Sequence, residues 1–127
     1  MKYNTFILFA MIFLHIVDDF KLQQGLLANL KQKNWWRNHQ EYKDVYKYDY
    51  IPALALHAFS WSFMVMLPIA VALHFDLGYW FIAYLCNMII HAIVDDLKAN
   101  KLKINLVEDQ LVHIFQILIT WLIFVFR

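Results

Sequence analysis

The stretch FILFAMIFLHIVDDF (residues 6–20) decides the fold of this chain. Nine apolar residues lead directly into His15, which Asp18 and Asp19 follow. Ionisable side chains inside an apolar segment are costly in a membrane and are interpreted first as functional. The chain of 127 residues is 62% hydrophobic, whereas a soluble domain is about half apolar. We therefore expect an all-α, polytopic membrane protein.

Four segments are apolar over roughly the 20 residues that a membrane-spanning helix requires. They cover residues 3–28, 52–74, 77–97 and 107–126. The second and third connections are short, which makes consecutive helices antiparallel neighbours. We expect residues 1–127 to form a single membrane domain, an antiparallel bundle of four transmembrane helices. No small-residue cleavage pattern follows the first apolar run, so we expect a retained helix rather than a secretory signal.

The longest connection, residues 29–51, alternates aromatic and charged residues in NWWRNHQ (34–40) and YKDVYKYDY (42–50). Such residues favour the headgroup level, so we expect an interfacial segment. Nine of the eleven Lys and Arg residues fall at the first and third connections, namely Lys21, Lys31, Lys33, Arg37, Lys43, Lys47, Lys98, Lys101 and Lys103. The positive-inside bias then places these two connections in the cytoplasm and both termini outside.

Histidine and aspartate recur four positions apart inside the apolar segments. The three pairs are His15–Asp19, His91–Asp95 and, in reverse order, Asp109–His113. The order inverts where the expected helix direction inverts, so the histidines share one depth and the aspartates another. Residues four apart share one helix face. We expect the pairs and His57 to form one polar site in the bundle centre, near the cytoplasmic side.

Imidazole nitrogen and carboxylate oxygen are the usual ligands of zinc, iron and manganese. Seven such side chains exceed what one tetrahedral ion uses, so the pattern predicts one or two divalent metals (zinc, manganese or iron), two of them lying about 3.5–4 Å apart. Bound cations would also offset the cost of burying three carboxylates. The same pattern is compatible with hydrogen bonding within each pair and with a proton or ion pathway.

Further polar residues lie beside the expected ligands. Asp18 and Asp96 each adjoin a motif aspartate and are candidates for a general base or for an acceptor that orients a ligating histidine. Gln23, Lys31, Lys98 and Gln110 are candidates for contacts with ligands or substrate. Lys98, Lys101 and Lys103 together suit an anionic lipid headgroup.

Four short elements resemble a small family of four-helix membrane proteins of unknown function found in bacteria and phages. The elements are H-x-x-x-D-F-x-x-Q from His15 to Gln23 with Lys31 eight residues later, LHA at Leu56–Ala58, H-x-x-x-D-x-x-K from His91 to Lys98, and D-Q-x-x-H from Asp109 to His113. Their order and spacing are similar over nearly the whole chain. The chain departs from the family pattern at Asp18 and in its long tyrosine-rich first connection. The resemblance implies the same membrane fold and polar site, but no reaction.

The residues favour a membrane-embedded, metal-dependent hydrolase acting on a lipid headgroup or other phosphorylated substrate at the cytoplasmic leaflet. The alternatives are a non-catalytic ion or proton conductor, a metal-dependent regulator of a membrane partner, and a di-iron oxidative enzyme. The expected surroundings are the lipid bilayer, and association with a second copy or another membrane protein is compatible with each function. The net charge of +1 gives no reason to expect a nucleic-acid partner.

Overall fold

Three long helices dominate the structure, a computed structural model that describes residues 4–38, 45–74 and 78–125. They are α4 (Tyr50–Ala72), α5 (Gly78–Ala99) and α6 (Leu106–Val125), and the described residues contain no strand. All three helices are long and apolar enough to cross a membrane. The prediction of an all-α chain with apolar helices of membrane-spanning length is confirmed for these three.

The predicted first helix, residues 3–28, is interrupted in the structure. It consists of α1 (Asn4–Val17), the π-helical turn η1 (Asp18–Leu22) and the short α2 (Leu26–Leu30). Gly25 separates η1 from α2 with a φ of 67°, a left-handed conformation that glycine adopts without steric cost. The 14 residues of α1 are fewer than the roughly 20 that span a bilayer. The prediction of one continuous helix over residues 3–28 was therefore wrong.

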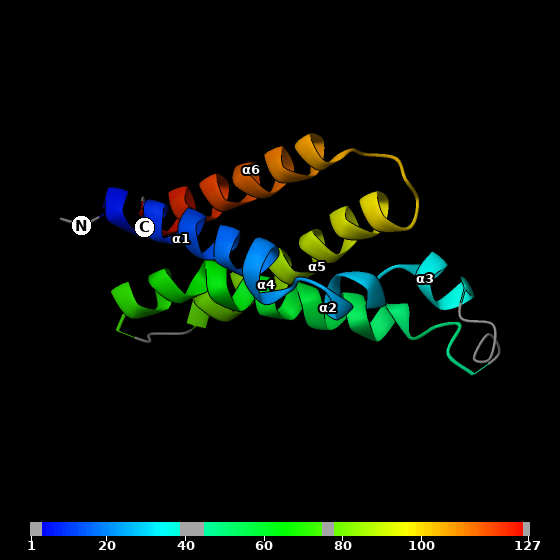
Figure 1. Cartoon of the computed structure of the whole chain (residues 1–127). Coiled ribbons are helices and arrows are strands. Elements are labelled where there is room, and N and C mark those ends of the chain that lie inside the picture. Colours follow the sequence, from blue (N-terminus) through cyan, green and yellow to red (C-terminus); the bar gives the residue numbers. More distant parts are fainter. Residues whose placement is uncertain (1–3, 39–44, 75–77, 126–127) are drawn as a thin grey trace.

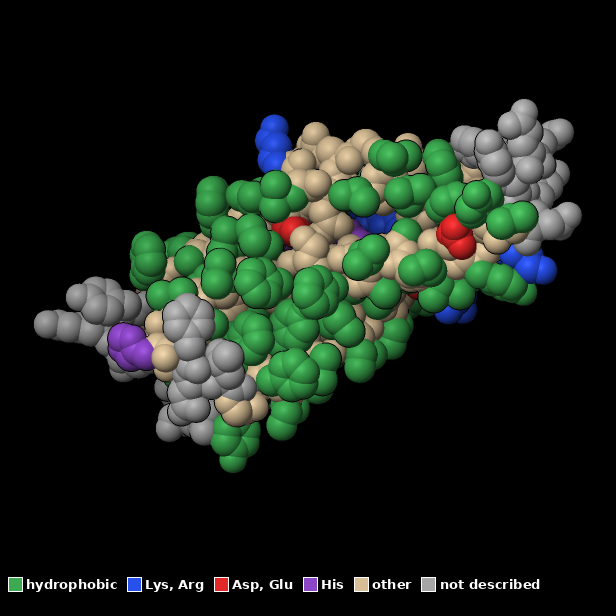
Figure 2. All heavy atoms as spheres, turned by 90° about the horizontal axis from the view of Figure 1, so that it is seen from below, with side chains coloured by type: hydrophobic (Ala, Val, Ile, Leu, Met, Phe, Trp, Pro, Cys, Tyr) green, Lys and Arg blue, Asp and Glu red, His purple; other side chains and the backbone are tan. Residues whose placement is uncertain are grey.

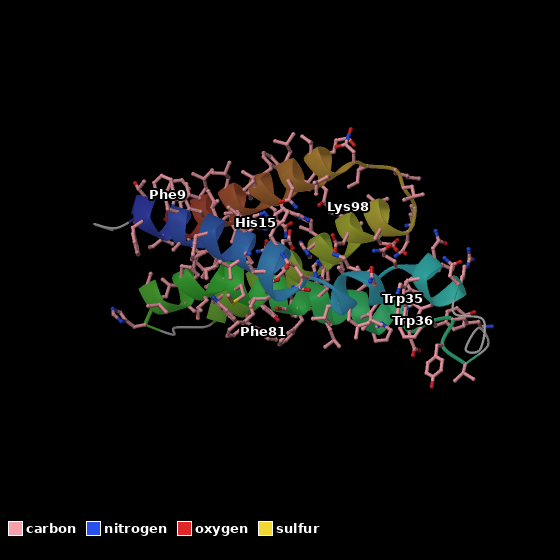
Figure 3. All side chains as sticks on the ribbon, viewed as in Figure 1. Phe9, His15, Trp35, Trp36, Phe81 and Lys98 are labelled. Atoms are coloured by element: carbon pink, nitrogen blue, oxygen red, sulfur yellow. The ribbon has the colours of Figure 1, made fainter. Side chains whose placement is uncertain are left out.

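The predicted aromatic connection, residues 29–51, contains regular structure. It holds the end of α2, the helix α3 (Lys33–Asn38) and the start of α4, while residues 39–44 lie outside the described part. The Trp36 indole N–H donates to the Leu30 carbonyl at 2.7 Å, and its ring stacks on Tyr46. Trp35 and Trp36 lie at the α3 end of the molecule (Figure 3). Residues 1–3, 75–77 and 126–127, which border predicted helices, also fall outside the description.

The chain termini and the basic connections lie at opposite ends of the molecule. The first turn of α1 and the last turn of α6 lie at one end, and α3 with the loop between α5 and α6 lies at the other (Figure 1). Between them, α4 packs against α1 and α5, and α6 packs against the same two helices. The first and third connections, which carry most of the basic residues, therefore lie at one end of the molecule.

On each long helix the buried side chains form one stripe along the helix, and this stripe includes the polar motif residues. On α1 the buried side chains follow four-residue steps through Ile7, Met11 and His15, while Phe9 and Phe13 are largely exposed. The inner stripes of α4 and α6 add Trp61 and Ile117 to a core adjoining the histidines. One face of the molecule is covered mainly by hydrophobic side chains (Figure 2). An apolar exterior around a polar interior is the arrangement that suits a bilayer.

Candidate metal centre

Three histidines from α4, α5 and α6 converge in the interior. His57 Nε2 lies 3.0 Å from His91 Nε2, and His91 Nδ1 lies 3.3 Å from His113 Nδ1. All three are at most 6% exposed. Each belongs to the inward stripe of its own helix, and the packing of these helices brings the stripes together. The predicted convergence of histidines from separate helices is present for these three residues.

Aspartates flank this row of rings. Asp95 Oδ2 lies 2.6 Å from His57 Nε2, and Asp19 Oδ1 lies 3.9 Å from the same nitrogen. Two groups of side chains each bring three potential ligand atoms within 4.8 Å of one another: Asp19, His57 and His91, and His91, Asp95 and His113. His91 belongs to both groups. Five of the seven predicted ligands therefore stand where an ion could contact them.

The ligand spacing and one oxygen suit a cation. Zinc–nitrogen bonds of about 2.0–2.1 Å at tetrahedral angles place two ligand nitrogens about 3.3 Å apart, close to the separations seen here. Asp19 Oδ1 is buried and has no hydrogen-bond partner among the described residues. A buried carboxylate oxygen without a donor is costly, and a bound cation would remove that cost.

The charge balance also suits a cation. Four carboxyl groups lie in or beside the cluster, on Asp18, Asp19, Asp95 and Asp109. Two of them have an ammonium partner: Lys31 Nζ lies 2.5 Å from Asp95, and Lys98 Nζ lies 2.6 Å from Asp109. The carboxyl groups outnumber the ammonium groups, and a bound cation would reduce this imbalance.

A chain of hydrogen bonds from Asp18 orients His57. The Gln23 amide nitrogen donates to Asp18, and the Gln23 carbonyl oxygen accepts from His57 Nδ1. Ser60 Oγ also donates to Asp18 at 2.7 Å. The proton on Nδ1 leaves the lone pair of His57 on Nε2, the nitrogen that faces His91 and the aspartates. Asp18, a candidate base, and Gln23 thus act through His57, as carboxylates commonly do behind ligating histidines.

His91 adjoins a second pair of side chains. His113 Nε2 and Asp109 Oδ1 lie 3.2 Å apart, and each is buried without a hydrogen-bond partner among the described residues. His91 Nδ1 lies 3.3 Å from His113 Nδ1. A neutral imidazole has one lone pair, so His91 serves one of the two groups at a time. The lone pair on His57 Nε2 and the unpartnered oxygen of Asp19 favour the group of Asp19, His57 and His91.

His15, a predicted ligand, has both nitrogens engaged elsewhere. Its Nδ1 accepts from the Trp61 indole N–H at 2.7 Å, and its Nε2 donates to Gln110 Oε1 at 3.0 Å. The Gln110 amide nitrogen lies 3.3 Å from Asp19 and 3.2 Å from Asp109. In this arrangement His15 and Gln110 hold the aspartates in position, and no lone pair of His15 is directed at an ion.

Trp61 is a central residue that the sequence analysis missed. Its indole stacks on the His91 ring at 4.2 Å and 14°, and its side chain is fully buried. Trp61 follows His57 by four residues on the inner face of α4. This is the spacing of the His–Asp pairs, so it was the available signal.

Asp96 and Lys31 have different roles from those of the ligands. Asp96 bonds to Lys101 at 3.0 Å and to the Asn100 amide at 2.9 Å, so it faces the end of α5 rather than the histidines. Asn100 also donates to the Lys31 carbonyl and accepts from the Lys33 backbone N–H. The Lys31 ammonium reaches Asp95 and lies 2.9 Å from His57 Nε2. Lys31 therefore competes with an ion for these two groups.

The roles of the histidines predict graded effects on metal affinity. His113→Ala removes the ring that contacts His91 Nδ1 but leaves the favoured ligands, so we expect zinc affinity to fall about 10- to 100-fold. Competition with a chromophoric chelator measures the affinity, and Asp96→Asn is the matched control that keeps it. Complete loss of metal in His113→Ala would instead place His113 among the ligands and favour the other group.

The chain was compared with known proteins by family, by sequence and by structure. No protein-family model, curated protein or solved structure matches it. The assignment of this site therefore depends on its geometry and chemistry.

Proposed function

We propose that this chain is a membrane-embedded hydrolase that uses one divalent metal ion to act on a phosphorylated amphiphile at the cytoplasmic leaflet. The convergence of His57, His91 and Asp19 carries the proposal, together with a buried oxygen of Asp19 that accepts from no donor within residues 4–38, 45–74 and 78–125. Three protein ligands leave a position for water, as in catalytic rather than closed structural sites. A bound ion lowers the pKa of that water toward neutrality.

Polar residues around the site suit an anionic substrate. Asp95 lies beside His57, where it supports the ion or accepts a proton from the attacking water. The ammonium groups of Lys31 and Lys98 lie next to the carboxylates of Asp95 and Asp109. These two cations favour phosphoesters over neutral esters.

The proposal includes a membrane arrangement. We propose that α1 and η1 together supply a fourth span, giving an antiparallel four-helix bundle in a bacterial inner membrane with both termini outside. The polar cluster then lies toward the cytoplasmic side, together with the basic connections. We also propose that the chain belongs to the family it resembles, the domain of unknown function 3307. The shared ordering of His, Asp, Lys and Gln elements supports that assignment.

Chelation tests the proposed reaction. We expect detergent-purified, metal-loaded protein to release phosphate from 1-palmitoylglycerol 3-phosphate, a single-chain phosphoester. Activity should disappear on dialysis against a chelator and return with zinc or manganese, because the ion supplies the nucleophilic water. Phosphate assay of the treated samples, with Asp19→Ala as the inactive control, measures the effect. An equal rate in metal-free protein would contradict the proposal.

The two other functions make different demands on the structure. Conduction needs a polar path from the cluster to the far end, and buried polar side chains do extend past His113 to Gln116 and Thr120. The next position on that face is the buried Phe124, so we expect no proton or ion flux in proteoliposomes. Di-iron chemistry needs both ligand groups at once, whereas the single lone pair of His91 favours one ion.

A further inference from the structure

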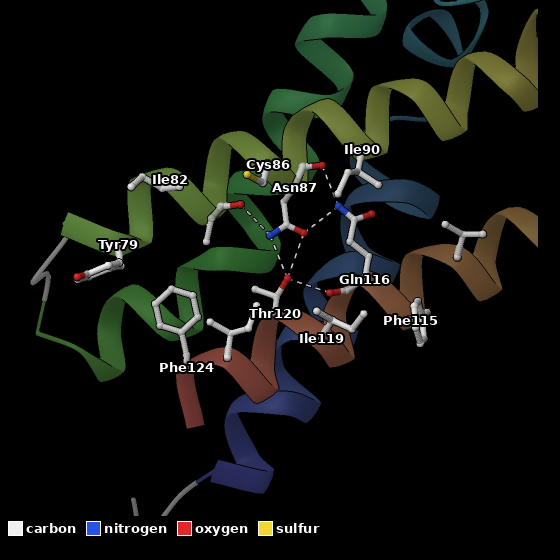
Figure 4. Close-up of a pocket in the computed structure, with 13 residues that line it drawn as sticks. Tyr79, Ile82, Cys86, Asn87, Ile90, Phe115, Gln116, Ile119, Thr120 and Phe124 are labelled. Atoms are coloured by element: carbon white, nitrogen blue, oxygen red, sulfur yellow. Dashed lines mark hydrogen bonds between the residues drawn. The ribbon is translucent and has the colours of Figure 1, made fainter. Parts of the chain in front are cut away.

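A pocket of about 840 Å³ lies between α5 and α6, on the side of these helices away from their connecting loop (Figure 4). Its walls are mostly apolar and include Ile82, Ile90, Phe115 and Ile119. The volume is within the range of about 300–1,000 Å³ that small-molecule pockets have. The helices that form it are two of the three long and apolar enough to cross a membrane.

The length of the pocket matches one lipid leaflet. On α5 it extends from Tyr79 to Ile90, and on α6 from Val112 to Phe124. At 1.5 Å per residue these stretches are about 16 and 18 Å long. Half of a hydrocarbon core of about 30 Å is about 15 Å. The pocket therefore has about the length of one lipid leaflet.

A polar network lines one wall of the pocket. The Asn87 amide donates to Thr120 Oγ1 at 3.0 Å, and the Gln116 amide donates to Asn87 Oδ1 at 2.8 Å. Gln116 is only 7% exposed, and its Oε1 has no hydrogen-bond partner among the described residues. A buried amide oxygen with no donor favours a ligand that brings one. An alkyl chain alone would leave this oxygen unsatisfied.

The network adjoins the candidate metal centre. Asn87 precedes His91 by four residues on α5, and Gln116 follows His113 by three on α6, so each shares a helix face with a histidine of the cluster. A donor bonded to Gln116 would lie about 4–5 Å along α6 from His113. A lipid whose hydroxyl bonds to Gln116 and whose chain extends toward Phe124 would have its polar end toward the cluster.

We propose that this pocket binds the substrate of the hydrolase, and that the substrate is a single-chain amphiphile with a hydroxyl group beside its phosphoester. The inference rests on the proposed function for the reaction and on the pocket for the ligand. The acyl chain occupies the space between α5 and α6, the hydroxyl donates to Gln116 Oε1, and the phosphoester faces the metal ligands. Selectivity for the hydroxyl comes from Gln116.

The reactivity of the lone cysteine can show whether a ligand occupies the pocket. Cys86 is exposed and lines the pocket, so a bound chain will shield its thiol. The experiment measures the rate at which N-ethylmaleimide modifies Cys86 in the detergent-purified full chain, against increasing 1-palmitoylglycerol 3-phosphate. We expect saturable protection. The analogue without the 2-hydroxyl should bind roughly 3- to 10-fold more weakly, because it loses one hydrogen bond to a buried acceptor.

Two variants test the two parts of the pocket. In Gln116→Leu the ligands with and without the 2-hydroxyl should bind equally. The ratio of their two affinities stays informative even if the variant is less stable, because both are measured on the same protein. Ala83→Phe adds a ring to the pocket wall and should abolish protection, whereas Ala55→Phe, at an exposed position of α4, should preserve it. Protection that persists in Ala83→Phe, or equal binding of both ligands to the unaltered chain, overturns the proposal. Protection without any hydrolysis keeps the pocket and removes the proposed reaction.

Discussion

Asp19→Ala protein should emerge from purification without divalent metal, whereas the unaltered chain should carry close to one ion. Asp19 supplies a buried oxygen with no donor in the described part of the chain, and it belongs to the ligand group that the lone pair of His57 favours. Its removal leaves His57 and His91 with too few partners to retain an ion through purification. Elemental analysis of the detergent-purified chain, expressed as metal per protein, measures the difference.

Glu108→Gln is the matched control for this change. Glu108 is an exposed carboxylate at the start of α6, where it accepts from the Asn105 backbone N–H, and glutamine can keep that bond. The variant should bind metal as the unaltered chain does. If the unaltered chain, purified without chelators and supplied with zinc, holds no metal, the metal proposal is wrong and the site is a polar core paired with Lys31 and Lys98. Two ions per chain would contradict the use of one ligand group at a time through the single lone pair of His91.

Trp61→Ala should cost about 3–5 kcal/mol of unfolding free energy, the range for removing a large buried aromatic side chain. Trp61 is fully buried, stacks on His91 and donates to His15. Its loss leaves a cavity beside the cluster and frees two rings to reorient. Unfolding titrations in mixed detergent micelles measure the change, and metal content should fall in the same variant because His91 loses its support.

Trp61→Phe separates packing from hydrogen bonding. Phenylalanine retains a ring against His91 but has no N–H for His15 Nδ1, so only the lost hydrogen bond and a smaller cavity remain. We expect a cost of about 1–3 kcal/mol, as for a buried acceptor left without its donor. A loss in Trp61→Phe as large as that in Trp61→Ala would show that the hydrogen bond, and not the stacking, maintains the cluster.

The sequence predicted the long helices and the residues that face inward, because both depend on periodicity. Apolar length located α4, α5 and α6 to within a few residues, and the four-residue spacing put His91 with Asp95 and His113 with Asp109 on inward faces. These properties belong to each helix alone. They needed no knowledge of how the helices pack.

The roles within the cluster could not be predicted in the same way. His15 has the spacing of a ligand, but Trp61 and Gln110 occupy its nitrogens, and both lie on other helices. Asp18 and Asp96 looked equivalent beside their motif aspartates, yet one supports His57 through Gln23 and the other bonds to Lys101. Such assignments depend on partners that only the packed helices supply.

Asn100 has a consequence for the order of biosynthesis. Its side chain holds the backbone at Lys31 and Lys33, which precede it by 69 and 67 residues. A growing chain exposes α2 and α3 long before the end of α5 leaves the ribosome. The segment that carries Lys31 therefore reaches its final position only after α4 and α5 have been synthesised.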